Sequence, residues 1–162
     1  MGALPNKLTG FQDVEDDEAR AKFEVAWDCT IPSDIGWNLT QMFEAMGRDE
    51  LKAIYCIGEN PVDSEADATH ARALLDRLDM LVVQDVFMTR TAEIADVVFP
   101  AALGWAESEG TVTNSERRVQ RMRAAVPPPG EARQEVEIIN DLAAAMGDDG
   151  WGQLTPEQLW EE

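Results

Sequence analysis

The residues best suited to chemistry lie where two apolar runs of the chain end. The run AIYCI stops at Gly58, and Glu59 and Asn60 follow at once in the stretch GENP. The later run MLVVQDVF carries a second polar pair, Gln84 and Asp85. Carboxylate and amide oxygens accept hydrogen bonds from ring N–H, exocyclic amine and ribose hydroxyl groups. These residues therefore suit the nucleoside end of a nucleotide, and a guanine base in particular.

Such side chains share a site only if the elements between them form a parallel sheet. The sequence predicts strands at 53–57, 80–87 and 96–100, and helices at 64–78 and 91–95. The order strand, helix, strand, with apolar runs this continuous, predicts parallel strands joined by right-handed crossovers. The expected fold is α/β: a doubly wound, mainly parallel sheet with helices on both faces, a Rossmann-like three-layer domain.

In such a sheet the carboxyl ends of the strands meet at one edge, where ligands bind. The four polar side chains are therefore expected on one rim, joined by Ser64 at the start of the intervening helix. The rim does not suit phosphate, because carboxylates repel it and the sequence contains neither GxGxxG nor GxxxxGK[ST]. A simpler alternative is that Asn60-Pro61 ends a strand and Asp85 makes a turn bond. Spacing alone favours this alternative.

The rest of the chain divides into a lead-in, a core domain and a tail. Residues 1–50 are expected to form an irregular N-terminal lead-in with helices, residues 51–147 the α/β domain, and residues 148–162 a tail. The further elements that the pattern predicts are helices at 15–27 and 38–46, an extended or hairpin segment at 110–126 with a turn near Asn114, and a closing helix at 136–147 that stops at Gly147.

The charge balance excludes several classes of partner. The 162 residues include 32 acidic and 13 basic side chains, which give a net charge of −19. A charge of this sign argues against a nucleic-acid or anionic membrane surface. Self-repulsion of this size is easiest to tolerate at high salt, which suggests a halophilic source. With no apolar run of membrane-spanning length and no signal-peptide pattern, a cytoplasmic location is expected.

The residue types that most often bind metals are scarce. Cys29 and Cys56 form no CxxC pair, and Cys56 lies in an apolar run, where a small buried thiol is the expected role. The single histidine, His70, falls on a predicted solvated helix face. We therefore assign no metal ligand and no catalytic residue to this chain.

Several longer motifs together resemble one family. In order, they are GENP, LVVQDVFMTRTAEIADVVFPAA, WAESEGTVTNSERRVQRMRAAVPPPGEAR and EIINDLAAAMG. They resemble the alpha (catalytic) subunits of formate dehydrogenases in the molybdopterin oxidoreductase, or dimethyl sulfoxide reductase, family. The resemblance covers about residues 1–147 as an ordered set, which is more specific than any single motif.

The resemblance implies a role in holding a cofactor. The family's subunit carries molybdenum or tungsten between two molybdopterin guanine dinucleotides, and this segment resembles the third of its four domains, which grips the guanosine end of one dinucleotide. Carried over by position, the cofactor-binding residues are Gly58, Glu59, Asn60, Ser64, Gln84, Asp85, Ser108 and Glu135. Glu135 departs from the family, which usually has aspartate followed by tryptophan there.

The resemblance also implies partners. The family's metal-binding and catalytic residues and its iron–sulfur cysteines belong to segments that precede this region, so the chain is expected to be inactive alone and to work with the remaining domains, an electron-transfer subunit and formate as substrate. Alternatives are an interaction module that kept the fold, and a nitrate-reductase-like relative. Arg117 and Arg118 fit either a pyrophosphate or neighbouring-domain contact, or simple pairing with surface acids, which is the favoured interpretation.

Overall fold

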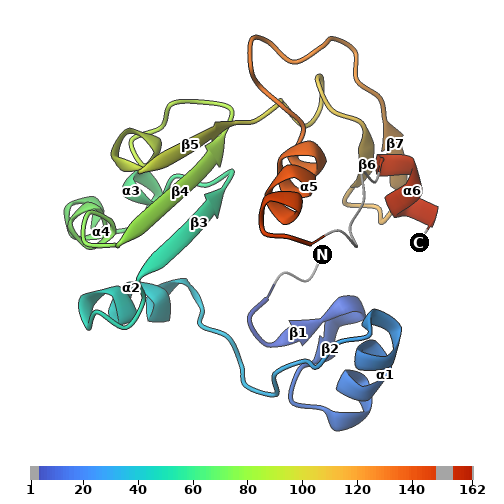
Figure 1. The fold of residues 1–162 in the computed structure, drawn as a ribbon, viewed down its shortest axis with the longest axis horizontal. Coiled ribbons are helices and arrows are strands. Elements are labelled where there is room, and N and C mark those ends of the chain that lie inside the picture. Colours follow the sequence, from blue (N-terminus) through green and yellow to red (C-terminus); the bar gives the residue numbers. More distant parts are fainter. Residues whose placement is uncertain (1–3, 149–154, 162) are drawn as a thin grey trace. The chain divides into compact units, whose positions relative to one another are not determined.

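The computed structural model describes residues 4–148 and 155–161 (Figure 1). By its internal contacts the chain divides into two compact units, Met1–Lys52 and Ala53–Glu162. The division lies close to the expected boundary at residue 50, and the limits of the functional domain stay a prediction.

The first unit contains two helices and a short strand pair. Helix α1 (Asp17–Trp27) begins after Asp16, whose carboxylate accepts from the backbone N–H groups of Glu18 and Ala19. Helix α2 (Leu39–Gly47) begins at a capping box between Asn38 and Gln41. Both helices were predicted. The antiparallel pair β1 (Lys7–Leu8) and β2 (Gln12–Asp13), joined by the 3-10 helix η1 (Thr9–Phe11), was not.

The second unit is built on a three-stranded parallel sheet. Its strands β3 (Ala53–Ile57), β4 (Met80–Asp85) and β5 (Val97–Pro100) lie in the order β3-β4-β5. The register places Ile57 beside Gln84 and Asp85 beside Pro100. A parallel sheet with helices packed against it confirms the predicted α/β class.

The connection from β3 to β4 differs from the single helix that the sequence predicts. Helix α3 (Pro61–Ser64) comes first, and helix α4 (Ala68–Leu75) begins after Asp67, whose side chain accepts from the backbone N–H of His70. Ser64 therefore ends a helix rather than starting one. The prediction failed because Pro61 starts its own turn directly after Asn60.

The core of this unit lies between the sheet and the crossover elements (Figure 1). Strands β4 and β5 are joined through the 3-10 helix η2 (Ala92–Ile94), which contacts β4. The buried apolar side chains that form this core are Val62, Ala71, Leu74, Leu75, Leu81, Val83 and Ala92. On the opposite side, residues of helix α5 (Glu135–Ala145) and Phe99 line one hollow of about 250 Å³.

An antiparallel hairpin follows the sheet. Strands β6 (Gly110–Thr113) and β7 (Val119–Met122) pair as predicted, with Asn114 at the turn. After α5 the chain turns at Gly147, whose φ of 85° favours glycine, also as predicted. Helix α6 (Pro156–Glu161) was not predicted.

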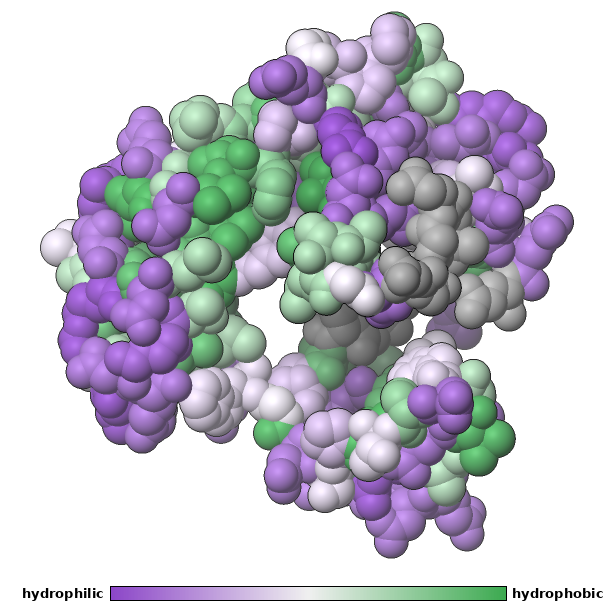
Figure 2. Space-filling view, viewed as in Figure 1, coloured by the Kyte–Doolittle hydropathy of each residue, from purple (hydrophilic) through white to green (hydrophobic). Residues whose placement is uncertain are grey.

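Figure 2 shows that hydrophilic residues cover much of the face in view, as the net charge of −19 requires. In the described ranges, every helix is too short or too polar to cross a bilayer.

Candidate nucleotide-binding edge

The GENP stretch turns sharply at the carboxyl end of the sheet. Gly58 has a φ of 63°, in the left-handed region that favours glycine, and its N–H donates to the Gln84 carbonyl at 2.9 Å. This bond brings the backbone after β3 against the end of β4. The expected meeting of the two polar segments at one edge is therefore present in the backbone.

Glu59 and Asp85 both influence Cys56 at this edge. The Cys56 thiol donates to the Glu59 carbonyl at 3.2 Å. Burial raises the pKa of the Cys56 thiol, the hydrogen bond to the Glu59 carbonyl lowers it, and the negative charges of Glu59 and Asp85 raise it. The charges of both carboxylates therefore act on the same thiol.

Asp85 also shapes the loop that follows β4. Its Oδ1 accepts from the backbone N–H of Phe87 at 2.9 Å. This is the turn bond of the simpler alternative, and it leaves Oδ2 directed away from that bond. The turn and a ligand can use different oxygens of the same carboxylate, because a carboxylate offers about four acceptor positions.

The raised pKa of Cys56 predicts a difference between the two thiols. Because the thiolate is the reactive form, we expect Cys29, which is exposed, to react with iodoacetamide at pH 8 at least about tenfold faster than buried Cys56. Peptide mass spectrometry over time measures both rates in one sample. The Cys56 rate should rise to that of Cys29 in 8 M urea, and equal rates in the native chain contradict the prediction.

Asn60 is engaged by the protein itself. Its Oδ1 accepts from the Thr91 hydroxyl at 2.8 Å and from the Thr91 N–H at 3.3 Å, and its Nδ2 donates to Asp63 at 2.8 Å. The Thr91 hydroxyl accepts in turn from the Val62 N–H at 3.1 Å. Asn60 thus joins the GENP turn to the segment before η2, and most of its hydrogen-bonding capacity is used.

Gln84 points to the other face of the sheet. Its Oε1 accepts from the Tyr55 hydroxyl, and the Tyr55 ring lies 6.2 Å from that of Phe99. Burial raises the pKa of Tyr55, so the hydroxyl stays a donor. The expectation that the rim side chains share one face is wrong for Gln84, because successive residues of a strand alternate between faces.

Two buried polar atoms have no partner among the described residues. Gln84 is 1% exposed, and its Nε2 makes no hydrogen bond. Ser108 is 6% exposed, and its Oγ makes none either. Since unpartnered buried polar atoms are rare in native proteins, each is a candidate ligand contact.

Ser108 and Glu135 form a second group, away from the GENP turn in sequence. Together with Leu159 and Trp160 of α6, they line a hollow of about 310 Å³. Ser64 is exposed at the end of α3. The eight predicted residues therefore do not form one site: Gly58, Glu59, Asn60 and Asp85 are at the sheet edge, Gln84 is on the opposite face, Ser64 is at the end of α3, and Ser108 and Glu135 are at this second hollow.

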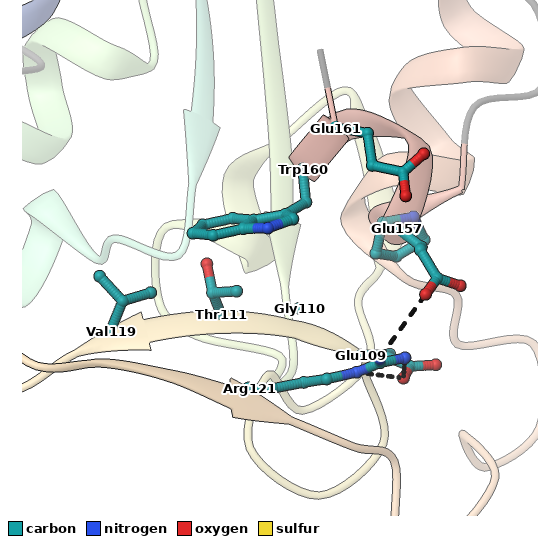
Figure 3. Close-up of a pocket in the computed structure, with 9 residues that line it drawn as sticks. Glu109, Gly110, Thr111, Val119, Arg121, Glu157, Trp160 and Glu161 are labelled. Carbon is teal, nitrogen blue, oxygen red and sulfur yellow. Dashed lines mark hydrogen bonds and ion pairs between the residues drawn. The ribbon is translucent and has the colours of Figure 1, made fainter.

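A neighbouring hollow of about 330 Å³ lies between the hairpin and α6 (Figure 3). Arg121 donates to Glu109 at 2.7 Å and lies 3.7 Å from Glu157, so it ties β7 to α6. The hydrogen bond to Glu109 raises the pKa of Arg121. Trp160 lies over Thr111 and Val119.

The loop after Asp85 exposes apolar side chains. Val86, Phe87 and Met88 are 41%, 73% and 67% exposed. Val86 and Phe87 line a hollow of about 680 Å³ whose other walls include Pro100, Ala101, Leu103 and Ala132. Three consecutive exposed apolar residues at a ligand-suited edge are typical of a surface that packs against another surface.

Sequence reasoning missed Thr91, Asp63 and Tyr55, the residues that hold the predicted ones in place. Thr91 is 31 residues from Asn60, and Tyr55 is 29 residues from Gln84. No local pattern signals such pairs. Among the described residues, no group of three or more His, Cys, Asp or Glu side chains could hold a metal ion.

The second unit is an α/β domain with a turn of polar residues at the carboxyl edge of its parallel sheet. Residues 3–145 match the family described as molybdopterin oxidoreductase. The chain belongs to the molybdopterin oxidoreductase family.

Several of the similar proteins are named as formate dehydrogenases. The F420-dependent formate dehydrogenase subunit alpha of Methanocaldococcus jannaschii is 48% identical over 147 residues, which are 91% of this chain and 21% of that protein. The putative formate dehydrogenase YrhE of Bacillus subtilis is 41% identical over 162 residues, 100% of this chain and 16% of that protein. The chain is thus homologous to formate dehydrogenase alpha subunits over its whole length and spans about a fifth of the length of these relatives.

A solved structure agrees with the fold. Acetylene hydratase from Pelobacter acetylenicus superimposes with a TM-score of 0.64 at 31% sequence identity. The similarity covers 73% of this chain and 17% of that enzyme.

Proposed function

We propose that this chain is the part of a formate dehydrogenase alpha subunit that holds the guanosine end of a molybdopterin guanine dinucleotide. The observation that carries the proposal is the hydrogen bond from the Gly58 N–H to the Gln84 carbonyl at 2.9 Å, which joins the GENP turn, with Glu59, to the end of β4, with Asp85, at the carboxyl edge of the sheet. Ligands of open α/β sheets bind at this edge.

The chemistry of the edge fits guanine. The base presents two adjacent donors, the ring N–H and the exocyclic amine, and a carboxylate can accept both in a bidentate arrangement. In this proposal Asp85 or Glu59 accepts from the base, and the unpartnered Ser108 Oγ supplies a hydrogen bond to a polar atom of the same cofactor. Gln84, buried on the opposite face beside Tyr55, supports the end of β4 instead. Asn60 positions the GENP turn instead of contacting the ligand.

In the whole subunit the cofactor would supply two-electron redox chemistry, oxidising formate to carbon dioxide at molybdenum or tungsten. An iron–sulfur cluster and an electron-transfer subunit would carry the electrons away. The residues of this chain would bind and orient the nucleotide. On this proposal the isolated chain is inactive.

Asp85→Asn tests the base contact most sharply. Asparagine keeps the oxygen that accepts from Phe87 but offers one acceptor where the carboxylate offers two. We expect the affinity of the chain for GDP, measured by calorimetry, to fall about tenfold, because a bidentate pair contributes roughly 1–3 kcal/mol. The matched control is Asp76→Asn at the end of α4, a carboxylate whose nearest cation is 3.8 Å away.

Three outcomes contradict the proposal. They are no GDP binding by the unmodified chain, equal affinities for Asp85→Asn and Asp76→Asn, and equal affinity for GDP and ADP. Affinity is expected to be weak throughout, since the remaining cofactor contacts belong to other domains.

A second candidate function, an interaction module that kept the fold, is favoured by the exposed Val86, Phe87 and Met88. The two proposals predict different coding sequences. An open reading frame that continues upstream through clustered cysteines supports the subunit, whereas independent expression from its own start codon supports the module.

We also propose that the chain works at high salt. An excess of 19 negative charges on 162 residues is costly to fold in dilute buffer, and screening by salt reduces this cost.

A further inference from the structure

The hairpin of β6 and β7 concentrates positive charge in an acidic chain. Four arginines, Arg117, Arg118, Arg121 and Arg123, lie within seven residues, although the chain carries a net charge of −19. The first two lie at the turn before β7, and the others lie on β7 or just after it. We call Arg117, Arg118 and Arg123 the hairpin arginines, a name that excludes Arg121.

These arginines differ from Arg121 in their surroundings. Arg121 is neutralised by Glu109 and Glu157 (Figure 3). The side chains of the hairpin arginines are exposed and form no ion pair or hydrogen bond within residues 4–148 and 155–161. The favoured interpretation from sequence, that Arg117 and Arg118 pair with the chain's own acids, does not hold in this part of the chain. Three cations on the hairpin of an acidic protein are thus without an ion pair among the described residues.

The turn holds the backbone of Arg117 and Arg118 in a defined conformation. Asn114 Oδ1 accepts from the Glu116 N–H at 2.9 Å and from the Arg118 N–H at 3.0 Å. The Asn114 N–H also donates to the Arg118 carbonyl at 3.1 Å. Because the backbone is fixed in advance, a ligand does not pay to order it.

Arg117 occupies a backbone position that favours glycine. Its φ is 63°, where a side chain with a Cβ is strained and glycine is not. An arginine with no partner in the described chain therefore carries backbone strain. Strained residues of this kind concentrate at sites that bind ligands.

From these observations we infer that the hairpin arginines are a docking site for a carboxylate-rich segment of a partner polypeptide. Guanidinium groups pair with carboxylates through two parallel hydrogen bonds, and arginine suits this contact better than lysine. At physiological salt the direct pairs persist, while repulsion from the rest of the chain is screened beyond about 8 Å. None of the three arginines is among the proposed nucleotide contacts.

The spacing favours a polypeptide over a phosphate group. Arg118 and Arg123 are five residues apart along an extended strand, which corresponds to roughly 16 Å, and this odd separation places them on opposite faces of the hairpin. A single phosphate or pyrophosphate cannot contact both. The hairpin arginines also line neither of the two hollows beside the hairpin. Exposed cations on both faces of one hairpin match a flexible polypeptide with several carboxylates.

A labelled ten-residue glutamate peptide tests this inference. Fluorescence anisotropy at 0.15 M NaCl would measure its binding to the 162-residue chain. We expect the triple variant Arg117→Gly, Arg118→Gln, Arg123→Gln to weaken binding about tenfold or more, because it removes three direct pairs. Its melting temperature should stay equal or rise, because Arg117→Gly relieves the strained backbone.

The matched control is the triple variant Arg48→Gln, Arg72→Gln, Arg133→Gln. It removes the same charge from surface arginines that have carboxylate partners. We expect it to change peptide affinity by about twofold or less, as a long-range charge effect. Equal weakening by both variants, no peptide binding by the unmodified chain, or tighter binding of inorganic pyrophosphate than of the peptide each overturns the inference.

Discussion

Replacing Thr91 by valine should lower the free energy of unfolding by about 2–4 kcal/mol. Thr91 is 0% exposed, and its hydroxyl donates to Asn60 and accepts from the Val62 N–H. Valine has nearly the same shape but leaves the Val62 N–H without an acceptor in a buried place. Urea denaturation followed by circular dichroism measures the change.

Thr91→Ser is the matched control, because it keeps the hydroxyl and removes one methyl group. Its loss should be about 1 kcal/mol or less. If the valine and serine variants lose the same amount, the hydrogen bonds are not what stabilises this turn. A loss confined to Thr91→Val would show that the GENP turn is held in place by a residue 31 positions away.

Lowering NaCl from 1 M to 0.01 M should destabilise the chain by on the order of several kcal/mol. Two unit charges 20 Å apart repel by about 0.2 kcal/mol in water, and an excess of 19 charges forms on the order of a hundred such pairs. Unfolding moves these charges apart. The Debye length grows from about 3 Å to about 30 Å over this range, so the repulsion is felt only in dilute salt.

Thermal unfolding at several NaCl concentrations measures this effect. Repeating the series near pH 4.5, where carboxylates begin to take up protons, is the control. The salt dependence should shrink there, because fewer charges remain to repel. The same dependence at both pH values would mean that salt acts through something other than carboxylate repulsion.

The sheet was predictable because its strands are continuous apolar runs. Ala53–Ile57 and Val97–Pro100 lie within one residue of their predicted limits. The crossover was predicted less well, since Pro61 starts a separate helix and Asp67 caps the next one. Helix α6 gave no recognised signal, because it is short and mainly polar.

The candidate site was predictable at the level of the backbone. The ends of two parallel strands must meet at one edge, and the Gly58 to Gln84 bond shows that they do. Side-chain direction was the error, although alternation along a strand already places Gln84 and Asp85 on opposite faces. The Thr91 to Asn60 contact could not be predicted, because it depends on how the loop before η2 packs.

Strand β3 has a hydrogen-bonded neighbour on one side only in the part of the chain that is described. Its outer row of backbone N–H and C=O groups is a template on which a strand from another molecule can add. Natural proteins protect such edges with charged residues. Here each copy of the chain carries a net charge of −19, and repulsion between copies opposes this strand addition. We expect this protection to be greatest in dilute salt and where the pH is well above the isoelectric point of about 4.2.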